Sequence, residues 1–473
     1  MTVAEPGDAM GAAVRLRLSQ HKYMSTSDSR MHAVLTVSAG DLGPARESAE
    51  VLLVDCSGSM STPPTKITEA RRAAIGALDA LPDGVLFAVV QGTDRARMAY
   101  PRTPELARMD ARTRDEATTA VSRLYAGGGT AMGGWLQLAD RLLAGHGGAV
   151  RHALLLTDGR DEGESVAVLD RALRECAGHF VCDARGIGED WRPDELRRIA
   201  SALRGGADSV RVEAELADDF RRLVRAAMAK VLPDLLIRVT ALPGSRLRFF
   251  KQAFPAELEL QPTSRGERTA EFRTGTWGPG EVREYHLGVD LRHDGEPMAE
   301  DLQIAVVQPV RAGDGGELGP PVPVLVHWTD DPQLSSRIDP LVAHYTGQAD
   351  LNAAVLAGCD AFDRGDAEGA RRHWARAVVL AHDSGNEEVL ARLRRLVEIR
   401  DAAGGVVAVR PDLRRVDFLN AAVGSNISTR GPERAPSAVP AGPERRCPEC
   451  DRRNPGDARY CECGHRFGTG SGR

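Results

Sequence analysis

Two apolar runs constrain the fold of this chain more than any other feature of the sequence. The first is VLLVDCSG at residues 51–58, and the second is ALLLTDG at residues 153–159. Continuous runs of this kind are typical of strands that are buried on both faces of a parallel sheet. Further strand-like and helix-like segments alternate with them over residues 48–232. This alternation predicts a doubly wound α/β domain.

A different pattern surrounds this domain. After Pro233, seven short segments of alternating apolar and polar residues are separated by Gly, Pro and Asp, and they end near residue 330. This spacing predicts an antiparallel β-sandwich over residues 233–330. Two similar segments in residues 1–47 have no partners in the α/β pattern. We therefore expect them to complete the sandwich, so that the α/β domain is an insertion between its strands.

The segment that follows is predicted to be a helical domain over residues 339–427. Three helix-like stretches occupy residues 349–366, 367–386 and 386–401. The Gly365-Asp366 turn, followed by Ala370, Trp374 and Ala377, resembles a single tetratricopeptide-type hairpin. One such hairpin cannot form a solenoid, because these repeats need stacked neighbours to bury their faces. We expect a helical brace.

Composition limits the classes of function. The net charge of −6 is not that of a protein whose whole surface binds nucleic acid. No stretch reaches the roughly 18 apolar residues that a membrane span needs. The start, MTVAEPGDAMGAA, lacks the basic and apolar regions of a secretion signal. These features predict a cytoplasmic protein, and the abundance of Arg and Ala suggests a bacterial one.

Five oxygen-bearing side chains follow the predicted buried strands. Asp55, Ser57 and Ser59 form a D-x-S-x-S motif after the first strand, Thr130 lies in GGGTAMGGW, and Asp158 ends the second strand. The carboxyl ends of strands in an open α/β sheet gather the ligands at one edge. Mg²⁺ prefers about six oxygen ligands in proteins. Two carboxylates and three hydroxyls fit Mg²⁺ or another divalent cation and leave room for one outside oxygen, for which a carboxylate is the natural donor.

This arrangement resembles the metal-ion-dependent adhesion site of von Willebrand factor A domains, with no position missing. Residues 184–203, ARGIGEDWRPDELRRIASAL, are similar to the last strand–helix unit of bacterial members. The resemblance covers residues 48–232 and implies a Rossmann-like fold. It also implies that the three hydroxyls bind the metal directly, whereas Asp55 and Asp158 can act through water. The implied function is binding of an Asp or Glu of a partner protein, in a bacterial signalling or ATPase-associated system.

Two other interpretations of the motif were weighed. Phosphotransferases with an aspartyl nucleophile also place Asp after a strand, but they need a second acid two residues later, where this chain has Ser57. No His lies within the motifs to act as a general base. A domain that keeps the fold without the metal would have lost one of the five positions. We therefore expect a metal-dependent scaffold protein and no enzyme.

The cysteines indicate a second metal site near the end of the chain. A Pro-rich linker is expected over residues 428–445, and residues 446–467 resemble a short zinc ribbon. The expected Zn²⁺ ligands are Cys447, Cys450, Cys461 and Cys463. The second pair is C-x-C where such ribbons usually have C-x-x-C, so His465 is an alternative ligand. Disulfides are the other alternative.

The same module offers an alternative function. Zinc ribbons often contact nucleic acid, and four arginines make this one mildly basic, namely Arg445, Arg446, Arg452 and Arg453. Nearby acids dilute this charge, so a protein-binding or structural role is favoured and a nucleic-acid-associated factor is the alternative. The sequence predicts neither the partner's identity nor the oligomeric state.

Overall fold

The computed structural model describes residues 13–43, 47–159, 163–210, 213–336, 339–428 and 430, together with residues 445, 446, 448, 453 and 454. Residues 13–431 form one compact unit. Outside it, the short strands β21 (Arg445–Arg446) and β22 (Arg453–Asn454) pair with each other in antiparallel fashion. The candidate zinc ligands Cys447, Cys450, Cys461, Cys463 and His465 lie outside the described residues.

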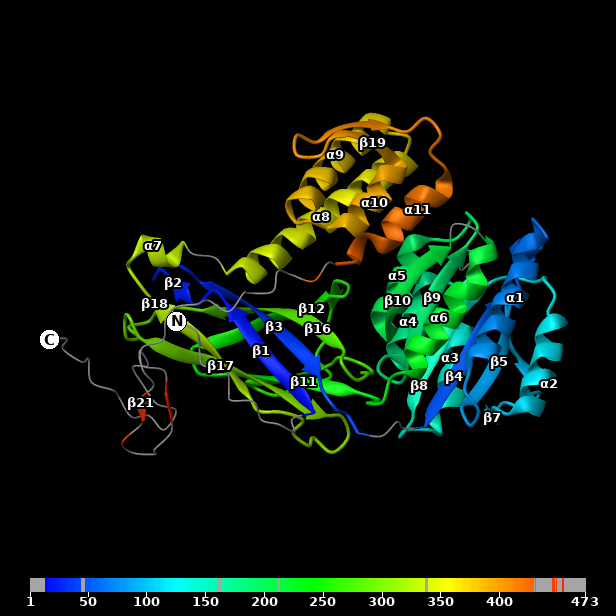
Figure 1. The fold of residues 1–473 in the computed structure, drawn as a ribbon, viewed down its shortest axis with the longest axis horizontal. Coiled ribbons are helices and arrows are strands. Elements are labelled where there is room, and N and C mark those ends of the chain that lie inside the picture. Colours follow the sequence, from blue (N-terminus) through cyan, green and yellow to red (C-terminus); the bar gives the residue numbers. More distant parts are fainter. Residues whose placement is uncertain are drawn as a thin grey trace. The chain divides into compact units, whose positions relative to one another are not determined.

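An α/β domain occupies the segment between residues 48 and 228 (Figure 1). Its elements are β4 (Ser48–Asp55), η1 (Gly58–Ser61), α1 (Thr65–Ala80), β5 (Leu86–Gly92), β6 (Ala96–Tyr100), β7 (Ala107–Arg108), α2 (Ala111–Ser122), α3 (Met132–Ala144), β8 (Val150–Thr157), α4 (Val166–Cys176), β9 (Val181–Ile187), α5 (Pro193–Leu203), β10 (Arg204–Val210), η2 (Glu213–Glu215) and α6 (Leu216–Met228). The strand order is β10-β9-β8-β4-β5-β6, with β7 also paired to β5. All pairs are parallel except those of β6 and β7 with β5.

Helices cover both faces of this sheet because successive strand side chains point to opposite faces. Leu52 and Val54 of β4 pack in the core that includes α1, α2 and α6. Val51 and Leu53 pack in the core that includes α3, α4 and α5. The sheet is therefore buried on both sides, which explains the continuous apolar runs in its sequence.

Two further sheets share one hydrophobic core. Their strands are β1 (Val14–Gln20), β2 (Tyr23–Met24), β3 (Arg30–Ala39), β11 (Leu235–Ala241), β12 (Ser245–Phe254), β13 (Leu258–Glu259), β14 (Ser264–Arg265), β15 (Thr269–Arg273), β16 (Val282–Leu291), β17 (Asp301–Arg311) and β18 (Val322–Trp328). One sheet has the order β1-β3-β16-β12-β13 and the other β14-β15-β11-β17-β18-β2. Strand β3 lies between β1 and β16, so segments on either side of the α/β domain in the sequence share a sheet. The expectation of a purely antiparallel sandwich was wrong at one edge, because the short strand β2 pairs with β18 in parallel fashion.

The C-terminal part of the unit is mostly helical. It comprises α7 (Pro332–Ser335), α8 (Pro340–Asp363), α9 (Ala367–Asp383), α10 (Glu387–Leu396), β19 (Val397–Asp401), β20 (Val406–Val409), α11 (Arg415–Val423) and η3 (Gly424–Asn426). Helices α8 and α9 form a hairpin at Gly365, where φ is +81°, and the Asp366 carboxylate accepts a hydrogen bond from Gly369 N at 2.8 Å.

One predicted helix in this region was wrong in its second half. The helix expected to reach residue 401 ends at Leu396, and β19 pairs with β20 as an antiparallel hairpin. Val397 and Val407 are buried, and the turn between the strands contains Gly405 at φ +65°. The β-branched residues and the glycine turn favour a hairpin over a longer helix.

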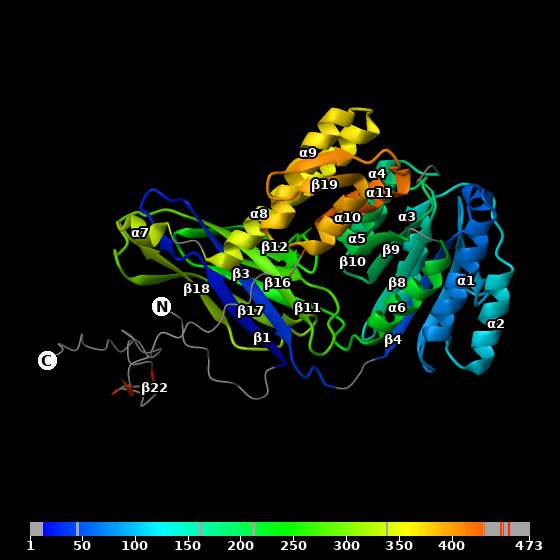
Figure 2. The ribbon, with the colours of Figure 1, turned by 45° about the horizontal axis from the view of Figure 1, so that its top comes forward.

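The helical region contacts both other parts of the unit (Figures 1 and 2). Toward the α/β domain, Arg197 of α5 donates to Ala422 O at 2.8 Å, and Arg392 of α10 pairs with Asp208 at 3.2 Å. Toward the sandwich, the Tyr345 hydroxyl of α8 donates to the buried carboxylate of Glu284. No helix among the described residues is long and apolar enough to cross a membrane.

Candidate functional site

The two acids of the predicted site lie at the same edge of the α/β sheet. Asp55 is the last residue of β4, and Asp158 directly follows β8. These strands are parallel neighbours, with Val54 opposite Leu156. Both carboxylates are 0% exposed. The carboxyl ends of adjacent strands therefore bring two buried acids together, as Asp55 and Asp158 at the ends of the two apolar runs predicted.

Hydrogen bonds join these acids to the two serines of the motif. Asp55 Oδ1 accepts from Ser57 N at 2.8 Å, and the Ser57 and Ser59 hydroxyl oxygens are 2.9 Å apart. Ser59 Oγ donates to Asp158 Oδ1 at 2.7 Å. Four of the five predicted side chains thus form one connected cluster, and Ser59 is its exposed member.

Thr130 reaches the same cluster from the loop before α3. A Cβ atom on Gly159 would lie 3.3 Å from Ser59 Oγ, 3.4 Å from Thr130 Oγ1 and 4.0 Å from Asp55 Oδ2. Three of the predicted oxygens therefore surround one small space, which any side chain at position 159 would fill.

Backbone hydrogen bonds hold the two loops in place. Gly127 N donates to Cys56 O at 2.8 Å, and Gly58 N donates to Gly128 O at 2.9 Å. These bonds run in both directions between the loop after β4 and the loop before α3. The serines and the threonine are thus fixed relative to each other by the backbone, which preorganises the cluster.

The electrostatics of Asp55 favour a positively charged ligand. Burial raises the pKa of Asp55 to about 6, although hydrogen bonds from Thr157 and Ser57 oppose this shift, and the nearby charge of Asp158 adds to it. Thr157 Oγ1 donates to Asp55 Oδ2 at 2.6 Å. The carboxylate is thus oriented by its neighbours, but no cation among the described residues pairs with it.

Lys66 was missed by the sequence analysis. Its Nζ atom, on the first turn of α1, lies 2.8 Å from Asp158 Oδ2 and 3.2 Å from Asp190 Oδ2. Burial opposes the charge of this ammonium group, but the hydrogen bond and the charge of Asp158 raise the Lys66 pKa. The available signal was a lysine at the start of the helix that follows the motif.

The donor set fits a hard divalent cation. The cluster offers two carboxylates and three hydroxyls, all oxygen, which is the chemistry that Mg²⁺ prefers. Within the described ranges, no group of three or more His, Cys, Asp or Glu is placed to hold a metal. A site for a softer metal with nitrogen or sulfur ligands is therefore not formed by this part of the chain.

Comparisons with known proteins agree with this geometry. A family model described as a von Willebrand factor type A domain matches residues 49–208, and one described as a von Willebrand factor type A C-terminal domain matches residues 379–425. A comparison with curated proteins gives no significant match.

Two solved structures are similar over most of the chain. The von Willebrand factor type A protein from Catenulispora acidiphila is 39% identical with a TM-score of 0.82, covering 89% of this chain and 97% of that one. The ArnB paralog VWA2 from Sulfolobus acidocaldarius is 12% identical with a TM-score of 0.53, covering 88% of this chain and 98% of that one, and shows a shared fold. On the strength of the first likeness, this chain belongs to the von Willebrand factor type A family.

Proposed function

We propose that this chain is a binding protein that captures an acidic side chain of a partner protein through a divalent cation. The ligands would be Asp55, Ser57, Ser59, Thr130 and Asp158. The observation that carries the proposal is the convergence of their oxygens around Gly159. Proteins of this family generally mediate protein–protein interactions.

The charge of the cluster supports an acidic partner. When bound, Mg²⁺ supplies a positive charge and a coordination position for an outside oxygen. Three of the five ligands are neutral hydroxyls, and Lys66 already offsets part of the charge of Asp158. Because two carboxylates alone oppose the dication, the loaded site retains positive charge, and a partner carboxylate is the matching ligand.

The surroundings favour binding over catalysis. Lys66 is the basic side chain that contacts the cluster, and it is held by Asp158 and Asp190. The buried thiol of Cys56, adjacent to Asp55, has its pKa raised to about 12 by burial, so it is a poor nucleophile. Metal-dependent turnover that disappears in Asp55→Ala would contradict this part of the proposal.

The experiment is affinity capture with the immobilised full chain in Mg²⁺ or in chelator. The matched variants are Asp55→Ala and Asp79→Ala, the latter an exposed acid near the other end of α1. We expect the partner to be retained by the unmodified chain and by Asp79→Ala only in Mg²⁺, and never by Asp55→Ala. The purified partner should then lose binding when one of its own acids is replaced by Ala. Equal retention in chelator would refute the proposal.

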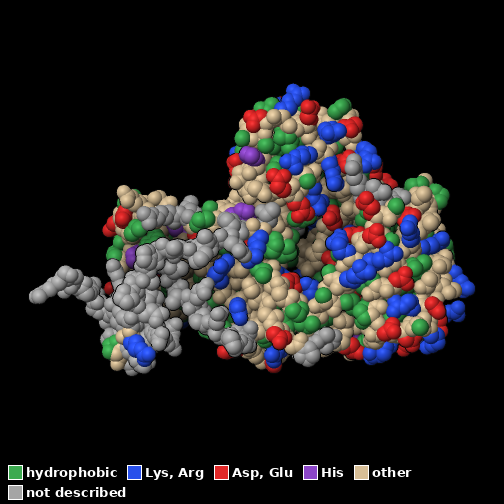
Figure 3. All heavy atoms as spheres, in the orientation of Figure 1, with side chains coloured by type: hydrophobic (Ala, Val, Ile, Leu, Met, Phe, Trp, Pro, Cys, Tyr) green, Lys and Arg blue, Asp and Glu red, His purple; other side chains and the backbone are tan. Residues whose placement is uncertain are grey.

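We also propose that the C-terminal cysteines hold zinc and add a tethered second contact. So few residues cannot fold around a hydrophobic core, so the metal would supply the stability. Elemental analysis should find about one Zn²⁺ per chain, lost in Cys447→Ser. Zinc-free protein purified without chelator would overturn this. On the face shown in Figure 3, acidic and basic side chains are interspersed, which favours a protein over a nucleic acid as the partner.

We propose the cytoplasm as the compartment. The cysteines of the described residues, Cys56, Cys176, Cys182 and Cys359, are all free and buried. Free thiols are typical of a reducing compartment. Recovery of the native protein from a membrane or secreted fraction would contradict this assignment.

A further inference from the structure

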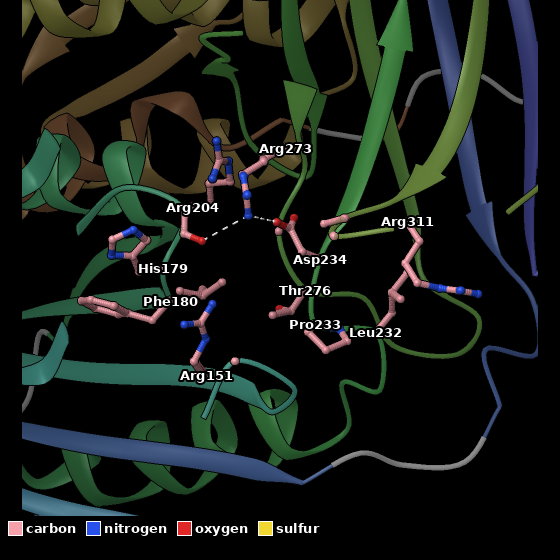
Figure 4. Close-up of a pocket in the computed structure, with 16 residues that line it drawn as sticks. Arg151, His179, Phe180, Arg204, Leu232, Pro233, Asp234, Arg273, Thr276 and Arg311 are labelled. Atoms are coloured by element: carbon pink, nitrogen blue, oxygen red, sulfur yellow. Dashed lines mark hydrogen bonds and ion pairs between the residues drawn. The ribbon is translucent and has the colours of Figure 1, made fainter. Parts of the chain in front are cut away.

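A cavity of about 270 Å³ lies where the α/β domain meets the sandwich (Figure 4). Arg151 on β8 and Arg204 at the start of β10 line it from the α/β side. Asp234, Arg273 and Thr276 line it from the sandwich side. Both sides thus contribute arginines to one enclosed space.

The positive charge in this cavity is only partly balanced. Arg273 pairs with Asp234 and also donates to Gly178 O at 3.4 Å. Within the described part of the chain, the side chains of Arg151 and Arg204 have no hydrogen-bond or ion-pair partner, and Arg204 Nε is fully buried. Three guanidinium groups therefore face one carboxylate, an excess of two positive charges.

Two further cationic residues of the lining do not change this balance. Arg311 pairs with Asp314 at 3.0 Å, and its side chain points away from the cavity in Figure 4. His179 pairs with Asp140 at 2.8 Å. The unbalanced charge is therefore confined to the inner group of Arg151, Arg204 and Arg273.

An unpaired guanidinium in a partly buried site is costly. Burial lowers the pKa of both Arg151 and Arg204, and the charge of Arg273 lowers each further. Arg204 also has a left-handed backbone, with φ at 55°, which a side chain rarely adopts. Charge repulsion and backbone strain at the same residue are typical of a site arranged for a ligand rather than for stability.

We propose that this cavity binds a small phosphate monoester and that the bound ligand ties the α/β domain to the sandwich. A phosphate monoester carries close to two negative charges near neutral pH, which matches the excess in the cavity. The planar guanidinium group presents paired donors that suit phosphate oxygens. The cavity is larger than one inorganic ion, and Phe180 and Leu232 give it an apolar wall for the organic part of the ligand.

This site is separate from the candidate metal centre. Arg151 is the second residue of β8, whereas Asp158 follows the last one. The two sites thus lie at opposite ends of the same strand, and the proposal does not depend on metal binding.

The test is calorimetric titration of the full chain with glycerol 3-phosphate and with inorganic phosphate, at matched ionic strength in chloride. The variants are Arg151→Gln and Arg204→Gln, with Arg311→Gln as the matched control at the same cavity. We expect saturable binding of one ligand per chain, tighter for glycerol 3-phosphate than for inorganic phosphate. Each inner variant should weaken it about tenfold or more, while the control leaves it unchanged.

Thermal unfolding of the same proteins guards against a purely structural effect. Without ligand, Arg204→Gln should unfold at or above the temperature of the unmodified chain, because it removes an unpaired charge. With glycerol 3-phosphate, the unmodified chain should be stabilised and Arg204→Gln should not. No saturable binding, equal affinity for inorganic phosphate, or equal weakening by Arg311→Gln would each overturn the proposal.

Discussion

The two ends of strands β4 and β8 carry charged groups in opposite situations. At the amino ends, His152 Nδ1 lies 2.8 Å from Glu50 Oε2, and its Nε2 lies 3.0 Å from Asp183 Oδ2 of the neighbouring β9. At the carboxyl ends, Asp55 and Asp158 meet three hydroxyls, with Lys66 on one oxygen. One end supplies its own counter-charge, while the other leaves a buried carboxylate without one.

The pKa values express this difference. Burial opposes a charged His152, but the charge of Glu50 and the hydrogen bond to Asp183 raise its pKa to about 10. Burial likewise opposes a charged Asp183, but the hydrogen bond from His152 lowers the Asp183 pKa to about 2. In contrast, burial raises the pKa of Asp55 to about 6. The same strands thus have an end that is closed by its own charges and an end that is prepared for a ligand.

Removing an acid should therefore have opposite consequences at the two ends. Glu50→Ala leaves a buried His152 with half of its compensation and should lower the free energy of unfolding by about 3–5 kcal/mol. Asp55→Ala should leave it unchanged or slightly higher in the absence of metal, because repulsion between Asp55 and Asp158 is relieved. Urea unfolding of both variants in chelator measures the contrast. A larger loss in Asp55→Ala than in Glu50→Ala would reverse the comparison.

The closed end also predicts a pH dependence. The folded pKa of His152, about 10, is above its ordinary value of 6.5. Its contribution to stability is therefore complete below about pH 6.5 and is lost as the pH rises toward 10. The difference in free energy of unfolding between the unmodified chain and His152→Gln should shrink over this range. A constant difference would show that His152 is neutral in the folded chain.

Lys66 links the open end to the metal. Lys66→Gln should lower the free energy of unfolding by about 1–3 kcal/mol without metal, because buried Asp158 loses its charged donor. Mg²⁺ should restore this loss and bind more tightly than to the unmodified chain, since a neighbouring cation is gone. Asp190→Asn is the control, because Asp190 is 70% exposed and its pairing is worth about 1 kcal/mol at most. Weaker Mg²⁺ binding by Lys66→Gln would contradict this role.

The sequence predicted most of the cluster because its positions are local to strand ends. Asp55 and Asp158 each follow a buried run, and the parallel order of strands brings such positions together. Lys66 was missed because a lysine on a helix usually indicates a solvated face. The β19–β20 hairpin was missed because its first strand continues a helical pattern without a break. The cavity arginines come from segments far apart in the chain, so no local signal marks them.

The central claim, that the open end binds a divalent cation, is tested most directly by calorimetric titration of the full chain with Mg²⁺. We predict one saturable site in the unmodified chain, a weaker one in Thr130→Ala, which loses a neutral ligand, and none in Asp55→Ala. The zinc ribbon is excluded as the source of the signal by repeating the titration with Cys447→Ser, which should behave like the unmodified chain. Unchanged Mg²⁺ affinity in Asp55→Ala, or no binding at all by the unmodified chain, would contradict the account.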